Sequence, residues 1–213
     1  MRGPPLPLRD YQLAAVEAAT KKNLICVLPT NSGKTVIAAT VVERVLLREN
    51  DPRGGARRKV IFLAPTRTLA HQQASVLLTQ VASLKGDAGE GPDSEDSSWR
   101  LGLIVGDKCG SHGRLSDYQV AVMTPAIFEN DLNRGHVRME DVALLVIDEA
   151  HHCRGKVKND QYTTIMKYHY MPCDEARRPR ILALTASPVE NAQAQRPDEV
   201  DFQANLRELE REL

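Results

Sequence analysis

The sequence lacks the features that mark several classes of protein. No apolar run approaches the roughly 20 residues of a membrane-spanning helix, and the first residues, MRGPPLPLRDYQ, contain no apolar core of a signal peptide. We therefore expect an intracellular protein, cytoplasmic or nuclear, without a membrane partner. Neither sign of charge dominates, because 28 Lys and Arg residues face 28 Asp and Glu residues. This balance argues against a histone-like sheath for nucleic acid and is compatible with a local basic groove.

Cysteine is scarce. The four cysteines lie far apart and form no C-x-x-C pair, which argues against both a zinc site and a disulfide framework. Cys26 lies within an apolar stretch and is predicted to be a small core residue.

Length and composition are those of one globular domain. The 213 residues are 42% hydrophobic and 26% charged, as is usual for globular proteins, and they suffice for a sizeable core. An acidic run rich in Gly and Ser, near 85–98, is predicted to be a mobile surface loop. We assign residues 1–197 to one domain and the helix-like run 198–213 to the start of a following element.

Short apolar runs alternate with helical patterns along the chain. Continuously apolar strands separated by helices indicate a parallel sheet covered on both faces. The predicted fold class is therefore α/β, three-layered, with a mainly parallel central sheet. Predicted strands are 24–28, 59–64, 101–105, 120–124, 142–148 and 180–185, and predicted helices include 10–22, 36–47 and 68–82. Ligands of such sheets bind beyond the carboxyl ends of the strands, so the polar residues there are the functional candidates.

The stretch LPTNSGKT, residues 28–35, ends like a phosphate-binding loop. Gly33, Lys34 and Thr35 match the positions that turn the backbone, reach the β and γ phosphates and ligate Mg²⁺. Leu28 and Asn31 stand where glycines are usual, and asparagine reaches positive φ more readily than other non-glycine residues. The strand, loop and helix order supports the motif, because a helix amino terminus attracts phosphate. A chance Gly-Lys-Thr at a helix start remains the alternative.

An acidic pair follows the predicted strand 142–148. Asp148 is the candidate partner of Mg²⁺, and Glu149 is the candidate base that orients the attacking water. A carboxylate that ends a buried strand is costly unless it is paired or bound to metal. The alternative is a structural pair at a helix amino terminus.

Five motifs together resemble the first RecA-like domain of superfamily 2 helicases. PTNSGKT, APTRTLA, MTP, DEAH and TAS occur in the order of that family, and RDYQ is similar to its adenine-reading Q motif. The similarity covers residues 6 to about 191 and is closest to the Dicer and RIG-I-like branch, fungal Dicer helicase domains in particular. It implies a RecA-like P-loop fold with ATP and Mg²⁺ as cofactors.

The resemblance also implies roles for individual residues. Catalysis would involve Glu149, Asp148 and Lys34, with Thr35 and Asp148 at the metal. The residues that bind the cofactor would be Arg9, Gln12, Asn31, Ser32, Gly33, Lys34 and Thr35, with Tyr11 in support. The residues that contact the RNA backbone would be Pro65, Thr66, Arg67 and Thr124. The residues that couple hydrolysis to RNA binding would be His151, Thr185 and Ser187. An ordinary helix start remains open for Tyr11, and loop capping for Thr66.

The resemblance implies the ATP-binding half of a nucleic-acid-dependent ATPase or helicase, namely the N-terminal helicase domain of a Dicer-like protein that processes double-stranded RNA. A second RecA-like domain would complete the site, so the isolated chain is expected to be weakly active or inactive as an ATP hydrolase. The alternatives are a RIG-I-like RNA-sensing ATPase, a nucleic-acid-binding scaffold with a weakened ATPase, and a metabolic P-loop NTPase, which the strand-end motifs disfavour.

Overall fold

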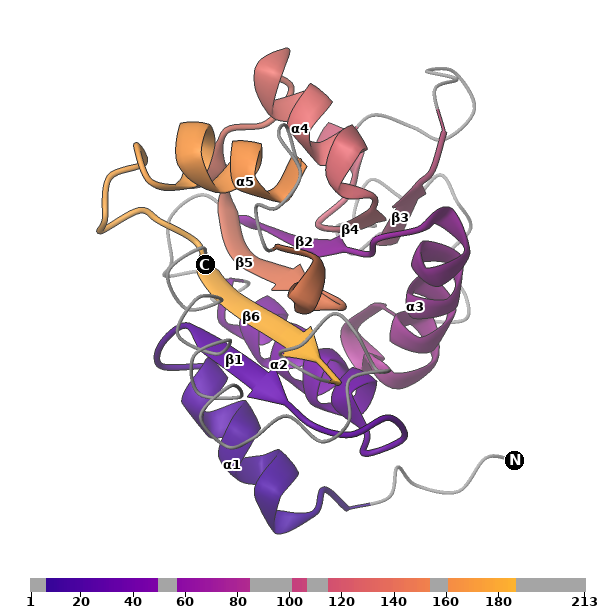
Figure 1. Cartoon of the computed structure of the whole chain (residues 1–213). Helices are drawn as coiled ribbons and strands as arrows, with labels where there is room; N and C mark the ends of the chain where they lie inside the picture. The colour runs from indigo at the N-terminus through magenta and orange to yellow at the C-terminus, as the bar shows by residue number, and fades with distance from the viewer. Residues whose placement is uncertain (1–6, 50–56, 85–100, 107–114, 154–160, 187–213) are drawn as a thin grey trace, which may run out of the picture.

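The central element is a six-stranded sheet in which every neighbouring pair is parallel (Figure 1). This computed structural model describes residues 7–49, 57–84, 101–106, 115–153 and 161–186. The strands are β1 (Leu24–Val27), β2 (Lys59–Leu63), β3 (Leu101–Ile104), β4 (Val120–Met123), β5 (Val142–Ile147) and β6 (Arg180–Thr185), in the spatial order β1-β6-β5-β2-β4-β3. The parallel α/β sheet predicted from the apolar runs is confirmed.

Helices cover both faces of the sheet. The α-helices are α1 (Asp10–Ala19), α2 (Lys34–Glu49), α3 (Arg67–Gln80), α4 (Pro125–Asn133) and α5 (Gln161–Ile165). Short turns are η1 (Ala82–Leu84), η2 (Leu115–Asp117), η3 (Met139–Asp141), η4 (Ala150–Cys153) and the π-helical η5 (Met166–Tyr170). Helices α1, α2 and α3 pack on one face, and α4 and α5 pack on the other.

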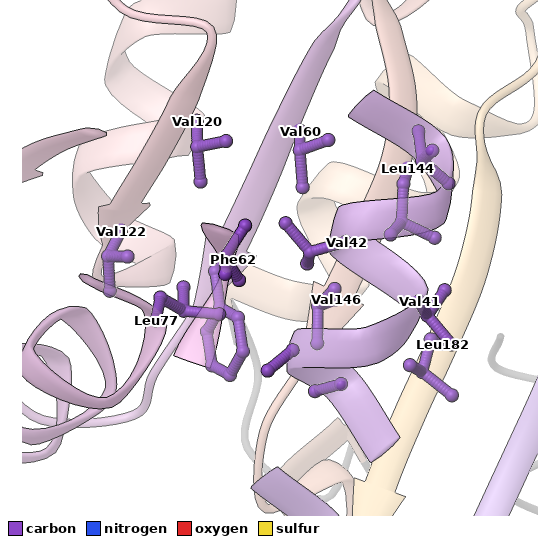
Figure 2. Close-up of a cluster of buried hydrophobic side chains, with 14 of the residues drawn as sticks. Val41, Val42, Val60, Phe62, Leu77, Val120, Val122, Leu144, Val146 and Leu182 are labelled. Carbon is purple, nitrogen blue, oxygen red and sulfur yellow. The ribbon is translucent and has the colours of Figure 1, made fainter. Parts of the chain in front are cut away.

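The two faces separate because side chains alternate along each strand. On β2, Val60 and Phe62 join the core beneath α2 and α3, whereas Ile61 and Leu63 join the core beneath α4 and α5. Figure 2 shows the first core, where Val42 of α2 and Leu77 of α3 pack near Phe62. Both faces of the four inner strands β2, β4, β5 and β6 are buried, which explains why their sequence runs are continuously apolar.

Several boundaries differ from the expectation by one to three residues. Helix α1 begins at Asp10, and its N-cap is Arg9, whose N–H donates to Oε1 of Gln12 at 2.9 Å. Cys26 is buried in the core, as predicted. No helix in the described part of the chain is long and apolar enough to cross a membrane. The predicted loop near 85–98 and helix 198–213 lie outside the described residues.

Candidate functional site

The register of the sheet brings the predicted site residues to its carboxyl edge. The last residue of β1, Val27, pairs with Thr185, and Ile147 pairs with Ala183 on one side and Leu63 on the other. The segments after β1, β5, β2 and β4 therefore leave the sheet at the same edge. All four segments carry residues predicted to bind nucleotide, metal or nucleic acid.

The loop between β1 and α2 turns through two residues with positive φ. Asn31 has φ 64° and Gly33 has φ 86°. Between them, the N–H and the hydroxyl of Ser32 both donate to the carbonyl of Pro29, at 3.3 and 2.6 Å. Asn31 thus adopts the left-handed conformation expected of it, and a β-branched residue at this position would be strained.

Helix α1 is fixed against this loop by polar side chains. The Tyr11 hydroxyl and Nε2 of Gln12 both donate to the carbonyl of Ser32, at 2.7 and 3.1 Å. Arg9 Nη1 lies 3.4 Å from the Tyr11 hydroxyl. Glycine at position 33 is favoured by its positive φ, and a Cβ atom there would push aside Nε2 of Gln12, the end of a flexible side chain. The predicted adenine-reading residues therefore lie beside the predicted phosphate loop.

Lys34 is the first residue of α2 and folds back into the loop. Its ammonium donates to the carbonyl of Leu28 at 2.7 Å and to that of Pro29 at 3.2 Å. The next residue, Thr35, is partly buried in the first turn of α2. The first turn of α2 presents backbone N–H groups and the positive end of the helix dipole, which suit a phosphate.

Asp148 is a buried carboxylate directly after β5. Only 5% of the residue is exposed. Oδ2 accepts a hydrogen bond from Nε2 of Gln73 at 2.7 Å, and Oδ1 accepts one from the N–H of Glu149 at 3.0 Å. Burial raises the pKa of Asp148, and the negative charge of Glu149 raises it further, whereas these hydrogen bonds and the charge of Lys34 oppose the rise. A buried carboxylate in this setting is stabilised by a nearby cation.

The oxygen donors at this edge suit Mg²⁺ better than a metal ion that is coordinated by protein side chains alone. Among the described residues, no group of three or more His, Cys, Asp or Glu side chains could hold a metal ion. Mg²⁺ is commonly bound through one or two protein oxygens together with water and substrate phosphates. The Asp148 carboxylate, directly after β5, and the Thr35 hydroxyl, in the first turn of α2, are donors of this kind.

His151 connects the acidic segment to the last strand. Its Nδ1 lies 3.3 Å from Oε2 of Glu149 and 3.1 Å from Oγ1 of Thr185. Thr185 is fully buried, and its carbonyl accepts the N–H of Leu28 at 3.1 Å, where the phosphate loop begins. Glu149 has φ 51°, a left-handed conformation that is unusual for glutamate. A continuous set of contacts therefore runs from the acidic pair to the phosphate loop.

The segments after β2 and β4 form a second part of the edge. These two strands are neighbours, and Leu63 pairs with Met123. Thr66 caps α3, because its Oγ1 accepts the N–H of Leu69 at 3.2 Å, so the capping alternative describes its side chain here. Arg67 is exposed at the start of α3.

The remaining residues of the predicted RNA-backbone and coupling sets are Thr124, Pro65 and Ser187. Thr124 caps α4 without a side-chain hydrogen bond to the helix, and Pro65 is partly buried. Ser187 lies outside the described residues.

Gln73 is a site residue that the sequence reasoning missed. It lies on α3, is 8% exposed, and bonds Asp148 across 75 residues of sequence. The available signal was its position on the buried stripe of α3, next to Ala74 and one turn before Leu77. A glutamine on an apolar stripe requires a hydrogen-bond partner from elsewhere in the fold.

Comparison with known proteins gives a consistent family. A model of the DEAD/DEAH box helicase family matches residues 9–194. The chain is 38% identical over 183 residues to Dicer-like protein 2 of Cryphonectria parasitica, covering 85% of this chain and 12% of that protein. It is 36% identical over 197 residues to endoribonuclease Dicer homolog 2b of Oryza sativa subsp. japonica, covering 88% of this chain and 13% of the relative.

A solved structure agrees with this assignment. The helicase domain of Hef from Pyrococcus furiosus superposes with a TM-score of 0.65 at 28% identity, over 95% of this chain and 36% of that chain. The chain thus spans about one eighth of the length of the curated relatives named above. With its helicase motifs gathered at the carboxyl edge of a RecA-like parallel sheet, the chain belongs to the DEAD/DEAH box helicase family.

Proposed function

We propose that this chain is the ATP-binding half of an RNA-dependent ATPase, the helicase domain of a Dicer-like protein that processes double-stranded RNA. The observation that carries the proposal is that Lys34, at the start of α2, and the buried Asp148, directly after β5, both follow strands that end at the carboxyl edge of the sheet. A cation beside a buried carboxylate, at the start of a helix, is the arrangement that Mg²⁺-dependent phosphoryl transfer needs.

The residues around the phosphate loop would divide the binding of ATP among them. Gln12, Tyr11 and Arg9 would meet the adenine, since they already lie against the loop. Ser32, Gly33 and Asn31 would surround the phosphates with backbone N–H groups, and Lys34 would exchange its bonds to loop carbonyls for bonds to phosphate oxygens.

Hydrolysis would depend on the acidic pair. Mg²⁺, held through Thr35 and Asp148, would neutralise charge on the phosphates. Glu149 would orient the water that attacks, because its carboxylate is only partly buried and lies beside His151. His151 and Thr185 would transmit changes between this pair and the RNA-binding edge, with Ser187 in the same role.

RNA would lie across the segments after β2 and β4. Pro65, Thr66, Arg67 and Thr124 offer a guanidinium, hydroxyl groups and backbone groups, which suit phosphate and ribose contacts and carry no base preference. We propose double-stranded RNA because of the similarity to Dicer-like proteins. A second RecA-like domain, in a longer chain, would close over the nucleotide and supply arginine fingers, without which turnover falls by roughly 10³-fold or more.

The test separates binding from turnover with two substitutions. Lys34→Ala should weaken ATP binding, because the lysine contacts phosphate before the reaction; Glu149→Gln should leave binding intact and abolish single-turnover hydrolysis. Affinity is measured on this chain, and hydrolysis on a longer form of the protein that contains the second RecA-like domain. Lys22→Ala, at an exposed position between α1 and β1, is the control for loss of one positive charge. Equal loss of affinity in both variants would remove Glu149 from the catalytic role.

A further inference from the structure

A basic pocket lies at the amino edge of the sheet, opposite the helicase motifs. It has a volume of about 410 Å³ and is lined by five basic side chains, Lys21, Arg48, Arg58, Arg178 and Arg180, and by no carboxylate. Helices α1 and α2 end here, and β5 and β6 begin here. At about 3.3 Å per residue, the five steps along β6 from Arg180, which lines the pocket, to Thr185 span roughly 17 Å.

Two of the arginines are fixed by backbone carbonyls. Arg180 Nη1 donates to the carbonyl of Thr20, at the end of α1. Arg178 donates from Nε to Cys173 at 3.1 Å and from Nη2 to Met171 at 2.9 Å. A guanidinium has five N–H donors, so these bonds hold each group in place and leave other donors available to the pocket.

The remaining basic side chains leave the pocket with excess positive charge. Arg58 pairs with Glu49 at 3.3 Å, whereas the side chains of Lys21 and Arg48 make no hydrogen bond or ion pair with the described part of the chain. Five cations against this one carboxylate leave a local charge of about +4. Burial lowers the pKa of Arg180, and the charges of Arg48 and Arg58 lower it further, which indicates that the guanidinium groups repel one another.

We propose that this pocket binds a compact polyanion that carries at least two phosphate groups. Arginine forks match phosphate oxygens in pairs, and an anion would relieve the mutual repulsion of the guanidinium groups. The volume falls within the roughly 300–1,000 Å³ of small-molecule sites. A concave site of this size suits a small ligand better than the continuous surface of an RNA duplex.

The structural alternative is that these arginines only stabilise helix and loop ends. That role accounts for Arg180 and Arg178, because a helix carboxyl terminus and free carbonyls attract cations. It also covers Arg48, in the last turn of α2, and Lys21, just after the cap of α1, but it gives no reason for five cations to converge on one pocket beside a single carboxylate.

The test uses tripolyphosphate as the probe, titrated by calorimetry at low ionic strength. All proteins carry Lys34→Ala, which weakens phosphate binding at the loop on the opposite edge. Lys21→Gln combined with Arg48→Gln should weaken tripolyphosphate binding by about tenfold or more. The control pair, Arg134→Gln with Lys167→Gln, removes two exposed positive charges elsewhere and should change affinity less than about twofold. Equal weakening by both pairs, or no binding by the parent protein, would overturn the proposal.

A second measurement covers the case in which the paired substitution disturbs folding. Amide shifts of the Lys34→Ala protein are followed during the same titration. Shifts centred on Thr20, Ala143 and Arg180 support the pocket, and shifts confined to the loop 28–33 refute it. Short RNA that displaces the probe from these same amides would assign the pocket to RNA and refute the small-ligand proposal. The ATP affinity of the protein with Lys34 intact is measured separately. A negative result for the basic pocket therefore leaves the proposed helicase function unaffected.

Discussion

Gln73 donates a hydrogen bond from Nε2 to Oδ2 of the buried Asp148, with 2.7 Å between the two atoms. The bond links helix α3, which begins at the proposed RNA-binding segment, to the carboxylate proposed to hold Mg²⁺. It orients one oxygen of Asp148, and the other oxygen accepts a hydrogen bond from the backbone N–H of Glu149. Gln73 is therefore a positioning residue between the two halves of the site.

Gln73→Leu should raise the Mg²⁺ concentration needed for half-maximal ATP hydrolysis by about 10- to 100-fold, the usual effect of losing a partner of a metal ligand. The measurement is a Mg²⁺ titration of ATP turnover in a longer form of the protein. Oε1 of Gln73 is buried without a partner in the described residues, and leucine removes that unpaired atom. Leucine also leaves Oδ2 of the buried Asp148 without its side-chain donor, so stability should fall by about 1–3 kcal/mol. Gln72→Leu, at an exposed neighbouring position, is the control; an equal Mg²⁺ shift in that variant would refute the assignment.

Asp148→Asn should stabilise the folded chain at neutral pH in the absence of Mg²⁺ and nucleotide. Burial raises the pKa of Asp148, so the folded state binds this proton more tightly than the unfolded state does. The free energy of unfolding of the wild type therefore falls as the pH rises from the ordinary aspartate value through the folded pKa. Asparagine does not ionise, so the variant does not lose this free energy of unfolding as the pH rises.

Thermal melts across pH check the sign. The variant should melt higher than the wild type at pH 7, by about 2–4 °C for each kcal/mol relieved, and the difference should shrink as the pH falls below the ordinary aspartate range. A difference that grows toward acidic pH would contradict the reasoning. Asp131→Asn, on α4 and outside the site, is the matched control.

Asn31→Gly should increase ATP affinity by at most roughly tenfold, because Asn31 already has the required φ of 64° and strain costs about 1 kcal/mol. Asn31→Val should lower affinity, since a β-branched residue is strongly disfavoured at positive φ. Both are measured by ATP titration. A wild type that binds no ATP, with full binding in the glycine variant, would favour a scaffold with a lapsed ATPase.

Arg67→Ala should weaken RNA binding to a similar degree for all sequences and flatten the dependence of log affinity on log salt by about one unit. The reason is that Arg67 is exposed at the start of α3, where a guanidinium can reach a phosphate. Binding is measured at several salt concentrations with two unrelated RNAs and the longer protein. Arg134→Ala, an exposed arginine after α4, should leave the slope unchanged. An altered sequence preference with an unchanged slope would refute backbone contact.

Local features of the fold and site could be predicted from the sequence because their cause is local. The apolar runs fixed the strands, since a strand buried on both faces has no polar alternation. The positive φ of Asn31 followed from the chemistry of its side chain. The acidic pair was placed at the carboxyl edge because it directly follows β5, whose final residue is Ile147.

Features that depend on tertiary contacts could not be predicted. Gln73 meets Asp148 only because α3 packs beside the end of β5. The Thr66 hydroxyl had two competing uses, and the start of α3 decided for the cap. The basic pocket draws Lys21, Arg58 and Arg180 from segments more than 30 residues apart, and no local pattern in the sequence joins them.

The strand order also has a consequence for how the chain folds. Within the described sheet, β1 pairs only with β6, so Leu24 finds its partner Leu182 across more than 150 residues. The side chain of Asn23 reinforces this contact by accepting the N–H of Ile181 at 3.0 Å. A nascent chain that has not reached Arg180 therefore has no strand on which β1 can dock. Contacts so distant in sequence form slowly. We therefore expect the loop 28–33 to remain sensitive to protease during refolding until β6 has paired with β1. This order is the reverse of synthesis, in which the loop is among the first segments made.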